Sequence, residues 1–376
     1  MGGAKLPDEA WVVSLSSLPG VGPSRLRWLL TQGEPEAVWG RVLSGSIAVG
    51  EHDENIRIPS TFLEQWSVAA ASVDPAAYWN AHVDAGIGVM TRWSASFPQE
   101  LAEDDDAPVV LFWLGDIDLL AGTRVAIVGT RRATRYGIDV ANEFARELSL
   151  AGVSVVSGLA LGIDGAAHAG ALAINGAPPI AVVGSGLDRV YPRAHRALWR
   201  AVAERGVVLS EYPLGASAVA WQFPARNRII AALSDVVVVV ESQSTGGALG
   251  TAVEAARRGR TVLAVPGPVT APSSAGTNQL LFDGCGPARD AGDVLLALGR
   301  EPERRRTSAE QRPRPIGNAK NVLDALPWQA VPVEQVLEST GLSLGEAMLV
   351  LEQLESDGWV SQRAGWIERI GRGGAQ

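Results

Sequence analysis

Six runs of apolar, mostly β-branched residues follow one another through the middle of the chain. They are RVAIVG (124–129), VSVVS (153–157), IAVVG (180–184), VVLS (207–210), VVVVVE (236–241) and TVLAV (261–265). Their apolar character is nearly continuous rather than alternating, which is typical of strands that are buried on both faces of a parallel sheet. Such strands need covering elements on both sides, so the runs constrain the fold strongly.

Segments with a helical pattern separate these runs. Residues 136–152 read YGIDVANEFARELSLAG, in which Ile138, Phe144, Leu148 and Leu150 roughly follow one helical face before a closing glycine. Strand and helix in repeated alternation predict an α/β fold with a doubly wound parallel sheet. Ligands of such sheets bind at the carboxyl ends of the strands.

Composition limits the classes of protein to which the chain can belong. The 376 residues are 47% apolar with a mean hydropathy of +0.11, which indicates a globular chain rather than a disordered one. An uncharged apolar run of about 18 residues is absent from the sequence. Residues 1–10 also lack a basic stretch followed by an apolar core. We therefore expect a soluble, cytoplasmic protein without a membrane partner.

Cysteine, histidine and net charge narrow the range of sites. The single Cys285 cannot form an internal disulfide, which fits a reducing compartment. The four histidines, His52, His82, His168 and His195, are widely scattered, so we expect no metal site. The net charge of -9 argues against a generally basic nucleic-acid binder but leaves room for a local basic groove.

The amino-terminal residues differ from the central region. Residues 1–80 hold short helical patterns and many tryptophans, and the turn LPGVGPSRL (18–26) lies between two of the expected helices. This turn resembles a helix-hairpin-helix motif, which offers backbone N–H groups to phosphates. A tight connection within a small helical bundle explains it equally well. We expect a small helical, SAM-like or helix-hairpin-helix domain at 1–80 and the core domain at 81–299.

The carboxy-terminal residues predict a linker and a further domain. Residues 300–318 carry six arginines against three glutamates, are rich in proline and read as a linker. From 319 to 376 a helix at 321–326, two more helical segments and a strand pair predict a winged-helix domain. Its expected recognition helix, 343–355, contains three glutamates and no basic residue. Because these charges repel phosphate, the pattern favours a protein contact over duplex DNA.

Small and basic residues follow the expected strands where a ligand would bind. Glycine after a strand lets a ligand approach the backbone, arginine supplies fixed positive charge, and N–H groups bind anions. The candidates are Gly129, Arg131, Arg132 and Arg135 after the first run, Ser157 and the Gly158 N–H after the second, Arg193 after the third, and Gly246 and Gly247 after the fifth. Together they predict one crevice suited to anions.

The segment WQFPARNRIIAALS (221–234) strengthens this prediction. It sets Arg226, Asn227 and Arg228 at the expected start of a helix, where free N–H groups and a partial positive charge favour phosphate. We expect Glu241 to accept hydrogen bonds from this segment rather than act as a base, because neighbouring arginines stabilise the carboxylate. Asp164 and His168 are interpreted as a capping residue and a packed residue, since neither is paired with a nucleophile in the sequence.

Two cofactor motifs are absent. No GxGxxG fingerprint with a following acidic residue comes after the first run, and no GxxxxGK[ST] loop occurs. The pattern therefore indicates a phosphate-binding site without a cofactor and without catalytic residues.

Six ordered blocks carry a family resemblance. VAIVGTRRATRYG, VVSGLALGIDGAAHAGAL, IAVVGSGLDRVYP, LSEYPLG, FPARNRIIAALS and AVPGPV, in this order, resemble the DNA-processing protein A (DprA/Smf) family over residues 105–298. The resemblance implies an extended Rossmann-like core that binds single-stranded DNA, a homodimer, and the loading of a RecA-type recombinase on incoming DNA during natural transformation. The two terminal domains match in layout only.

The resemblance also implies the DNA contacts. By position these are Gly129, Thr130, Arg131, Ser157, Gly158, Arg193, Arg226, Asn227 and Arg228, with Gly246 and Gly247 in the fifth loop. Two positions depart from the family pattern, because His195 replaces a common asparagine and TGGA (245–248) replaces a common lysine-serine-glycine-serine run. Aromatic residues near these loops, namely Tyr191, Trp221 and Phe223, are candidates for base stacking, with a core role equally open for Phe223.

Two other functions stay open at this point. ESQSTGGALGTAVE (241–254) resembles, with one residue inserted, the PGGxGTxxE loop of lysine-decarboxylase-like phosphoribohydrolases, which cleave nucleoside monophosphates. The insertion moves Glu254 out of the matching register. A structural adaptor with an inert core is the third interpretation.

Overall fold

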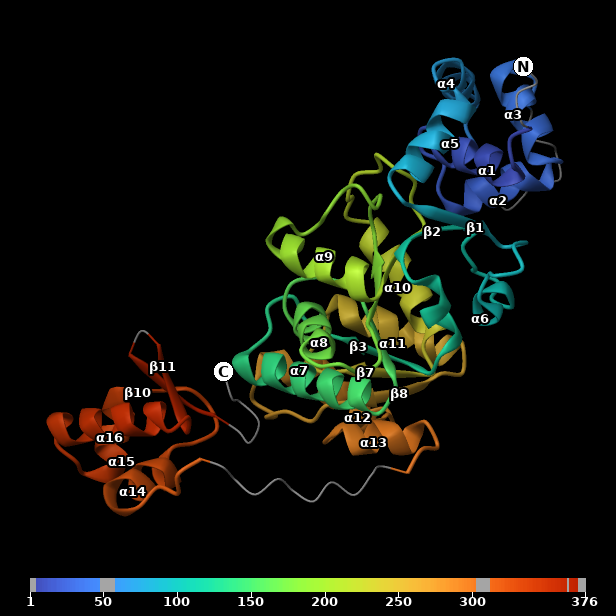
Figure 1. The fold of residues 1–376 in the computed structure, drawn as a ribbon. Helices are drawn as coiled ribbons and strands as arrows, with labels where there is room; N and C mark the ends of the chain where they lie inside the picture. The colour runs from blue at the N-terminus through green and yellow to red at the C-terminus, as the bar shows by residue number, and fades with distance from the viewer. Residues whose placement is uncertain (1–4, 48–57, 302–311, 364, 371–376) are drawn as a thin grey trace. The chain divides into compact units, whose positions relative to one another are not determined.

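A computed structural model describes residues 5–47, 58–301, 312–363 and 365–370 (Figure 1). Contacts divide the chain into one unit of residues 1–301 and a second of residues 302–376, each of which is described by itself. His52 and residues 302–311 of the expected linker lie outside the described residues.

A mostly parallel sheet organises the first unit. Its strand order within the described residues is β1-β2-β6-β5-β4-β3-β7-β8-β9. Strands from β6 through β9 in this order pair in parallel, while β1 pairs with β2 and β2 with β6 in antiparallel fashion. The strands are β1 (Gly88–Thr91), β2 (Val110–Gly115), β3 (Arg124–Val128), β4 (Ser154–Ser157), β5 (Ile180–Val183), β6 (Val207–Ser210), β7 (Val236–Val239), β8 (Thr261–Ala264) and β9 (Gly286–Pro287).

Helices cover both faces of this sheet, as the valine-rich runs require. The covering helices are α7 (Arg135–Leu150), α8 (Ile163–Leu172), α9 (Arg196–Arg205), α10 (Gln222–Leu233), α11 (Gly247–Arg257), α12 (Ala275–Phe282) and α13 (Ala291–Ala297). On β3, Val125 and Ile127 pack in a core with α7 and α8, while Ala126 and Val128 pack with α10 and α11 on the opposite face (Figure 1). The doubly wound α/β prediction is confirmed.

A group of helices precedes the sheet. It comprises α1 (Asp8–Ser16), α2 (Pro23–Thr31), α3 (Pro35–Leu43), α4 (Ser60–Ala70) and α5 (Pro75–Asp84). The indole of Trp66, which is fully buried, donates to the Pro19 carbonyl at 2.8 Å and so anchors the turn between α1 and α2. At the other side Tyr78 Oη donates to the Leu214 carbonyl at 2.8 Å, which ties α5 to the core. Helix α5 continues to Asp84, beyond the expected domain limit at residue 80.

Short elements complete the first unit. They are helix α6 (Gln99–Ala102) and the 3-10 turns η1 (Ile117–Ala121), η2 (Arg193–His195) and η3 (Pro272–Ser274). No helix in the described part of the chain is long and apolar enough to span a bilayer.

The second unit is a small domain of three helices and three strands within residues 312–370. Its elements are α14 (Gly317–Ala325), β10 (Val331–Pro332), α15 (Val333–Thr340), α16 (Leu344–Ser356), β11 (Val360–Arg363) and β12 (Trp366–Arg369), with strand order β10-β12-β11. Helix α14 begins four residues before the expected 321. Ser343 and Glu346 form a capping box that starts α16.

Candidate nucleic-acid interface

Loops from several strands meet at the carboxyl edge of the parallel sheet. The Thr130 N–H after β3 donates to the Glu241 carbonyl after β7 at 2.8 Å. The Ile163 N–H at the start of α8 donates to the Thr130 carbonyl at 3.3 Å. On the other side, His195 Nδ1 lies 3.0 Å from the carbonyl oxygen of Leu159. Parallel pairing therefore brings together the loops that the sequence predicted to share one crevice.

Arg131 is an exposed basic residue beside these contacts. Its guanidinium carbon lies 4.8 Å from the ring centroid of Phe223. The ring centroids of Phe223 and Tyr191 are 5.2 Å apart. Among the described residues, no acidic side chain forms an ion pair with Arg131, with Arg132 or with Arg193, and all three are exposed. An exposed cation that lies over an aromatic ring and forms no ion pair can bind a phosphate beside a base.

The fifth loop joins this area through Asn227. The side-chain amide of Asn227 donates to the carbonyl of Gly247 at 3.3 Å, and Gly247 begins α11. A side chain at Gly247 would meet open space, whereas one at Gly246 would collide with Ser242 Oγ. The exposed helix start thus presents backbone N–H groups to solvent beside Asn227. We call residues 130–132, 191–193, Phe223, Asn227 and 246–247 the strand-end surface.

Three predicted site residues take part in internal packing or internal hydrogen bonds. A side chain at Gly129 would collide with Ile163, so this glycine makes room for α8 rather than for a ligand. Ser157 is fully buried and its hydroxyl donates to the Ile127 carbonyl at 2.6 Å. The Gly158 N–H donates to Asp164 Oδ2 at 3.1 Å and is therefore already paired.

Arg226 is buried, contrary to its expected place at a helix start. Helix α10 begins at Gln222, which leaves Arg226 in its second turn with 4% of its surface exposed. Its Nη1 donates to the Val182 carbonyl on β5. Burial lowers the pKa of Arg226, and the charge of Asp164 opposes this change. The guanidinium is thus buried at the carboxyl end of β5 and does not face solvent.

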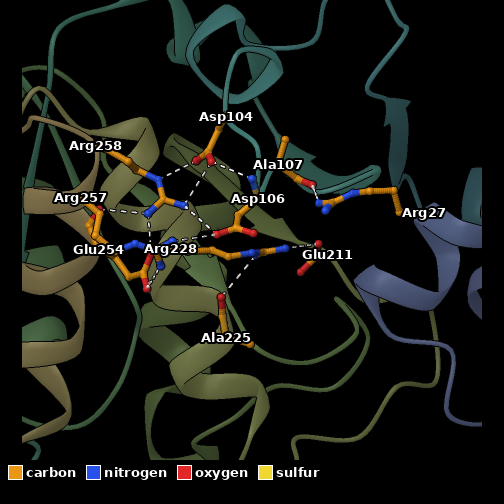
Figure 2. A network of polar contacts seen from close by, with 10 residues as sticks. All are labelled: Arg27, Asp104, Asp106, Ala107, Glu211, Ala225, Arg228, Glu254, Arg257 and Arg258. Atoms are coloured by element: carbon orange, nitrogen blue, oxygen red, sulfur yellow. Dashed lines mark hydrogen bonds and ion pairs between the residues drawn. The ribbon is translucent and has the colours of Figure 1, made fainter. Parts of the chain in front are cut away.

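Arg228 is held by a partner that the sequence analysis did not consider. Its Nη2 donates to Glu211 Oε1 at 2.5 Å, and this carboxylate follows β6 (Figure 2). Glu211 lies in the block LSEYPLG at a strand end, and an acidic residue at that position was the available signal. Burial raises the pKa of Glu211, and the charge of Arg228 lowers it again.

The expectation that Glu241 accepts hydrogen bonds from residues 226–228 is wrong. Its carboxylate accepts instead from the Thr134 N–H at 2.9 Å and from Thr134 Oγ1 at 2.5 Å. A side chain at Gly137 would collide with the same carboxylate. Glu241 therefore anchors the start of α7, because β7 pairs in parallel with β3, the strand that leads into this helix.

His168 is packed as expected, whereas Asp164 does not cap its helix, because α8 begins after Gly162 without a side-chain cap and Asp164 lies in its first turn. Asp164 orients the loop through its bond from the Gly158 N–H. His168 is fully buried, and burial lowers its pKa to about 3. A neutral histidine in the interior is a packed residue at physiological pH.

Glu254 does not have the surroundings of a catalytic carboxylate. It accepts from Arg258 Nη1 at 2.5 Å and from Arg257 Nη1 at 3.3 Å, and Arg258 also bonds to Asp104 (Figure 2). Two arginine side chains thus occupy this carboxylate in ion pairs. This geometry does not favour the phosphoribohydrolase alternative.

The chain matches two known family models. Residues 88–299 match the model of DNA recombination-mediator protein A, and residues 306–365 match that of the DprA winged helix domain. The second match agrees with the helices and strands of residues 312–370, so the winged-helix prediction is confirmed.

Curated relatives cover most of the chain. Protein Smf of Escherichia coli is 35% identical over 74% of this chain and 76% of its own length. Protein Smf of Synechocystis is 30% identical over 95% of this chain and 98% of its own length. The putative DNA processing protein DprA of Mycobacterium tuberculosis is 40% identical over 72% of this chain and 70% of its own length.

Two solved structures share the fold. DNA processing protein A from Streptococcus pneumoniae superposes with a TM-score of 0.63 and 32% identity over 78% of this chain and 98% of its own. DNA processing protein A from Helicobacter pylori, whose structure concerns its single-stranded DNA binding mode, gives a TM-score of 0.52 and 30% identity over 56% of this chain and 95% of its own. Sequence blocks, domain models and fold agree, and the chain belongs to the DNA recombination-mediator protein A family.

Proposed function

We propose that this protein binds single-stranded DNA along the strand-end surface. The observation that carries the proposal is Arg131, which is exposed, forms no ion pair among the described residues and lies over Phe223 beside Tyr191. Arginine binds phosphate and the aromatic rings stack on bases, which is the combination found in proteins that bind single strands without sequence preference. The Helicobacter pylori relative, which binds single-stranded DNA, supports the same role.

A polymer suits this surface better than a mononucleotide. Its basic and N–H groups are spread over the loops after β3, β5 and β7 and are not gathered around one enclosed site. Arginine and backbone N–H groups hold phosphates without reading bases, so we propose binding that is largely independent of sequence. For each phosphate bound, log affinity falls by about 0.7 per log unit of salt.

A titration tests this proposal directly. Fluorescence anisotropy of a labelled oligo-dT is measured with the full-length protein over a series of salt concentrations, with a duplex of the same length as the comparison. We expect tight binding of the single strand at low salt and a linear loss of log affinity with log salt. Absent or salt-independent binding would defeat the proposal.

We further propose that the protein acts by binding and not by catalysis. The paired state of Glu254 supports this view. Incubation with nucleoside monophosphates, followed by chromatography for free base, is expected to give no turnover above a blank. Steady release of base that disappears in Glu254→Gln would establish the enzymatic alternative instead.

The wider role follows from the family. We propose that the protein, as a cytoplasmic homodimer, protects incoming single-stranded DNA and loads a RecA-type recombinase on it during natural transformation and recombination. Light scattering after size exclusion tests the dimer, with a monomer at working concentration as the contrary result. Recombinase filament assembly on DNA covered by single-strand binding protein tests the loading, which should be faster when this protein is present.

We also propose the domain division 1–80, 81–299, 300–318 and 319–376. The many arginines and prolines of 300–318 support a linker there. Limited trypsin digestion should cut first within 300–318. Earlier cleavage near residue 80 would contradict a firm attachment of the helical domain, which the Tyr78 to Leu214 hydrogen bond supports.

A further inference from the structure

We propose that Arg226 is a positioning residue whose buried guanidinium, together with Asp164, holds the loop of residues 158–162 against the loop that carries Arg131. The inference rests on the proposed DNA binding, and it changes the role of a residue that the family resemblance assigns to DNA contact. Exposed arginines such as Arg131 would bind phosphate, whereas Arg226 would fix the conformation of the loop next to them.

Arg226 fills space that another residue leaves for it. Its Nη1 donates to the Val182 carbonyl, and its guanidinium occupies the place where a side chain at Gly158 would begin. Only glycine at residue 158 leaves room for that guanidinium. With 4% of its surface exposed, Arg226 offers little of its guanidinium to a phosphate from solvent.

Asp164 supplies the opposite charge from the first turn of α8, directly after this loop. It is 6% exposed, and it accepts the Gly158 N–H at 3.1 Å. Burial raises the pKa of this carboxyl, and the Arg226 charge lowers it. The two charges therefore compensate each other in part, Arg131 also acts on Asp164, and removal of Arg226 leaves the buried carboxylate with less compensation.

The backbone of residues 158–162 is conformationally restricted and contacts the loop that carries Arg131. Leu159 has a φ of +53° and is the one non-glycine residue with positive φ among the described residues. Gly162 has a φ of +77°, and a side chain there would collide with the Thr130 carbonyl. The next N–H, of Ile163, donates to that carbonyl at 3.3 Å. A shift of residues 158–162 must therefore move Thr130 and Arg131.

A double-mutant cycle tests the inference. Oligo-dT affinity and its salt slope are measured for wild type, Arg226→Met, Asp164→Asn and the double variant, with Arg131→Ala as the comparison. We expect Arg226→Met to lose about tenfold in affinity and the double variant to recover to within about threefold of wild type, because the second change removes the uncompensated carboxylate. The double variant should keep the wild-type salt slope, while Arg131→Ala loses about 0.7 of it.

The contrary result is equally specific. If the double variant stays as weak as Arg226→Met and its salt slope also falls by about 0.7, Arg226 contacts a phosphate and the inference is overturned. A gain in affinity for Asp164→Asn alone that equals the gain in the double variant would likewise overturn it, since the effect would then be general charge and not coupling.

Two further measurements keep the test independent of folding and of the proposed function. Gly158→Ala retains every arginine but displaces the guanidinium, so it should weaken binding, and unchanged affinity in a folded Gly158→Ala protein would overturn the inference. Amide hydrogen exchange without DNA should quicken at residues 130–132 and 158–163 in Gly158→Ala but not in Arg131→Ala. If wild type fails to bind DNA, the proposed function fails, yet this exchange pattern still decides whether Arg226 positions the loop.

Discussion

The strand-end surface and the winged-helix domain are the two regions where nucleic acid would be sought, and their charges differ in sign. Arg131, Arg132 and Arg193 are exposed at the strand ends without an acidic partner among the described residues. Helix α16 exposes Leu344, Met348 and Leu349 beside glutamates. Over residues 317–370 eight acidic residues face three basic ones. A fold that commonly binds DNA does so only when its surface attracts phosphate.

Two glutamates of α16 also form hydrogen bonds within their own domain. Glu346 completes the capping box with Ser343, and Glu355 accepts the Gln362 N–H at 2.8 Å and so ties α16 to β11. These glutamates support the domain itself, and the exposed apolar side chains between them fit a protein partner better than a duplex.

The largest expected effect is at the strand ends. Arg131→Ala combined with Arg193→Ala should weaken oligo-dT binding by about 100-fold or more, since each charge-assisted contact contributes about 1.5–3 kcal/mol. The slope of log affinity against log salt should be smaller by about 1.4 in this double variant, because two phosphate contacts are lost. The matched control, Arg257→Ala with Arg289→Ala, removes the same charge from two exposed arginines that already pair with acidic residues. Equal losses in both double variants would reduce the surface to a net-charge effect.

Stacking should contribute next. Tyr191→Ala removes an exposed ring beside Phe223 and should cost roughly 1–3 kcal/mol of binding free energy, with no change in salt slope, because stacking displaces no counterions. Anisotropy measures both quantities, and Trp93→Ala, an exposed aromatic outside the strand-end surface, is the control. A reduced slope in Tyr191→Ala would show that the ring holds the arginine in place instead.

Lowering the pH should destabilise the first unit more than the winged-helix domain. His168 has a folded pKa of about 3, against an unfolded value of about 6.5, so the unfolded chain binds one more proton between these limits. The free energy of unfolding of the first unit should therefore fall by about 1.4 kcal/mol per pH unit for this residue as the pH drops below about 6.5. The pKa of His82 is also lowered by burial, which adds a loss of the same sign.

The winged-helix domain provides the contrast in the same experiment. Residues 312–376 contain no histidine, and the pKa of Glu346 is lowered by its bonds to Ser343. Its stabilising effect is present above the ordinary glutamate range and is lost only as the pH falls through that lowered value. The unfolding free energy, taken from hydrogen-exchange protection factors corrected for the intrinsic exchange rate at each pH, should thus fall from pH 7 to pH 5 in the first unit alone, and parallel falls in both would refute the assignment to buried histidine.

The smallest effect is expected at α16. Glu352→Lys should change oligo-dT affinity by no more than about threefold, as is usual for an exposed substitution away from a site. A protein that ends at Glu301, where the first unit ends, should bind within the same range. A tenfold loss in the shortened protein would move part of the DNA site to the winged helix and remove the contrast between the regions.

The strands and the covering helices of the core were largely predictable. The observed strands from β3 to β8 fall within the six apolar runs, because burial on both faces leaves a continuous pattern. The antiparallel strands β1 and β2 and the edge strand β9 were missed. The first contains a glycine that accommodates Trp113 of its neighbour, and β9 has two residues, so neither has a pattern that stands out from a loop.

The order of blocks along the chain was sufficient to predict a basic crevice at the strand ends and the family of the protein. It did not decide which arginine faces solvent. Arg131 and Arg226 both follow from the same blocks, yet one is exposed and the other is buried against Gly158, and Arg228 pairs with Glu211 from another strand end. Side-chain type and local pattern follow from neighbours in sequence, whereas burial and pairing depend on segments that meet only when the sheet assembles.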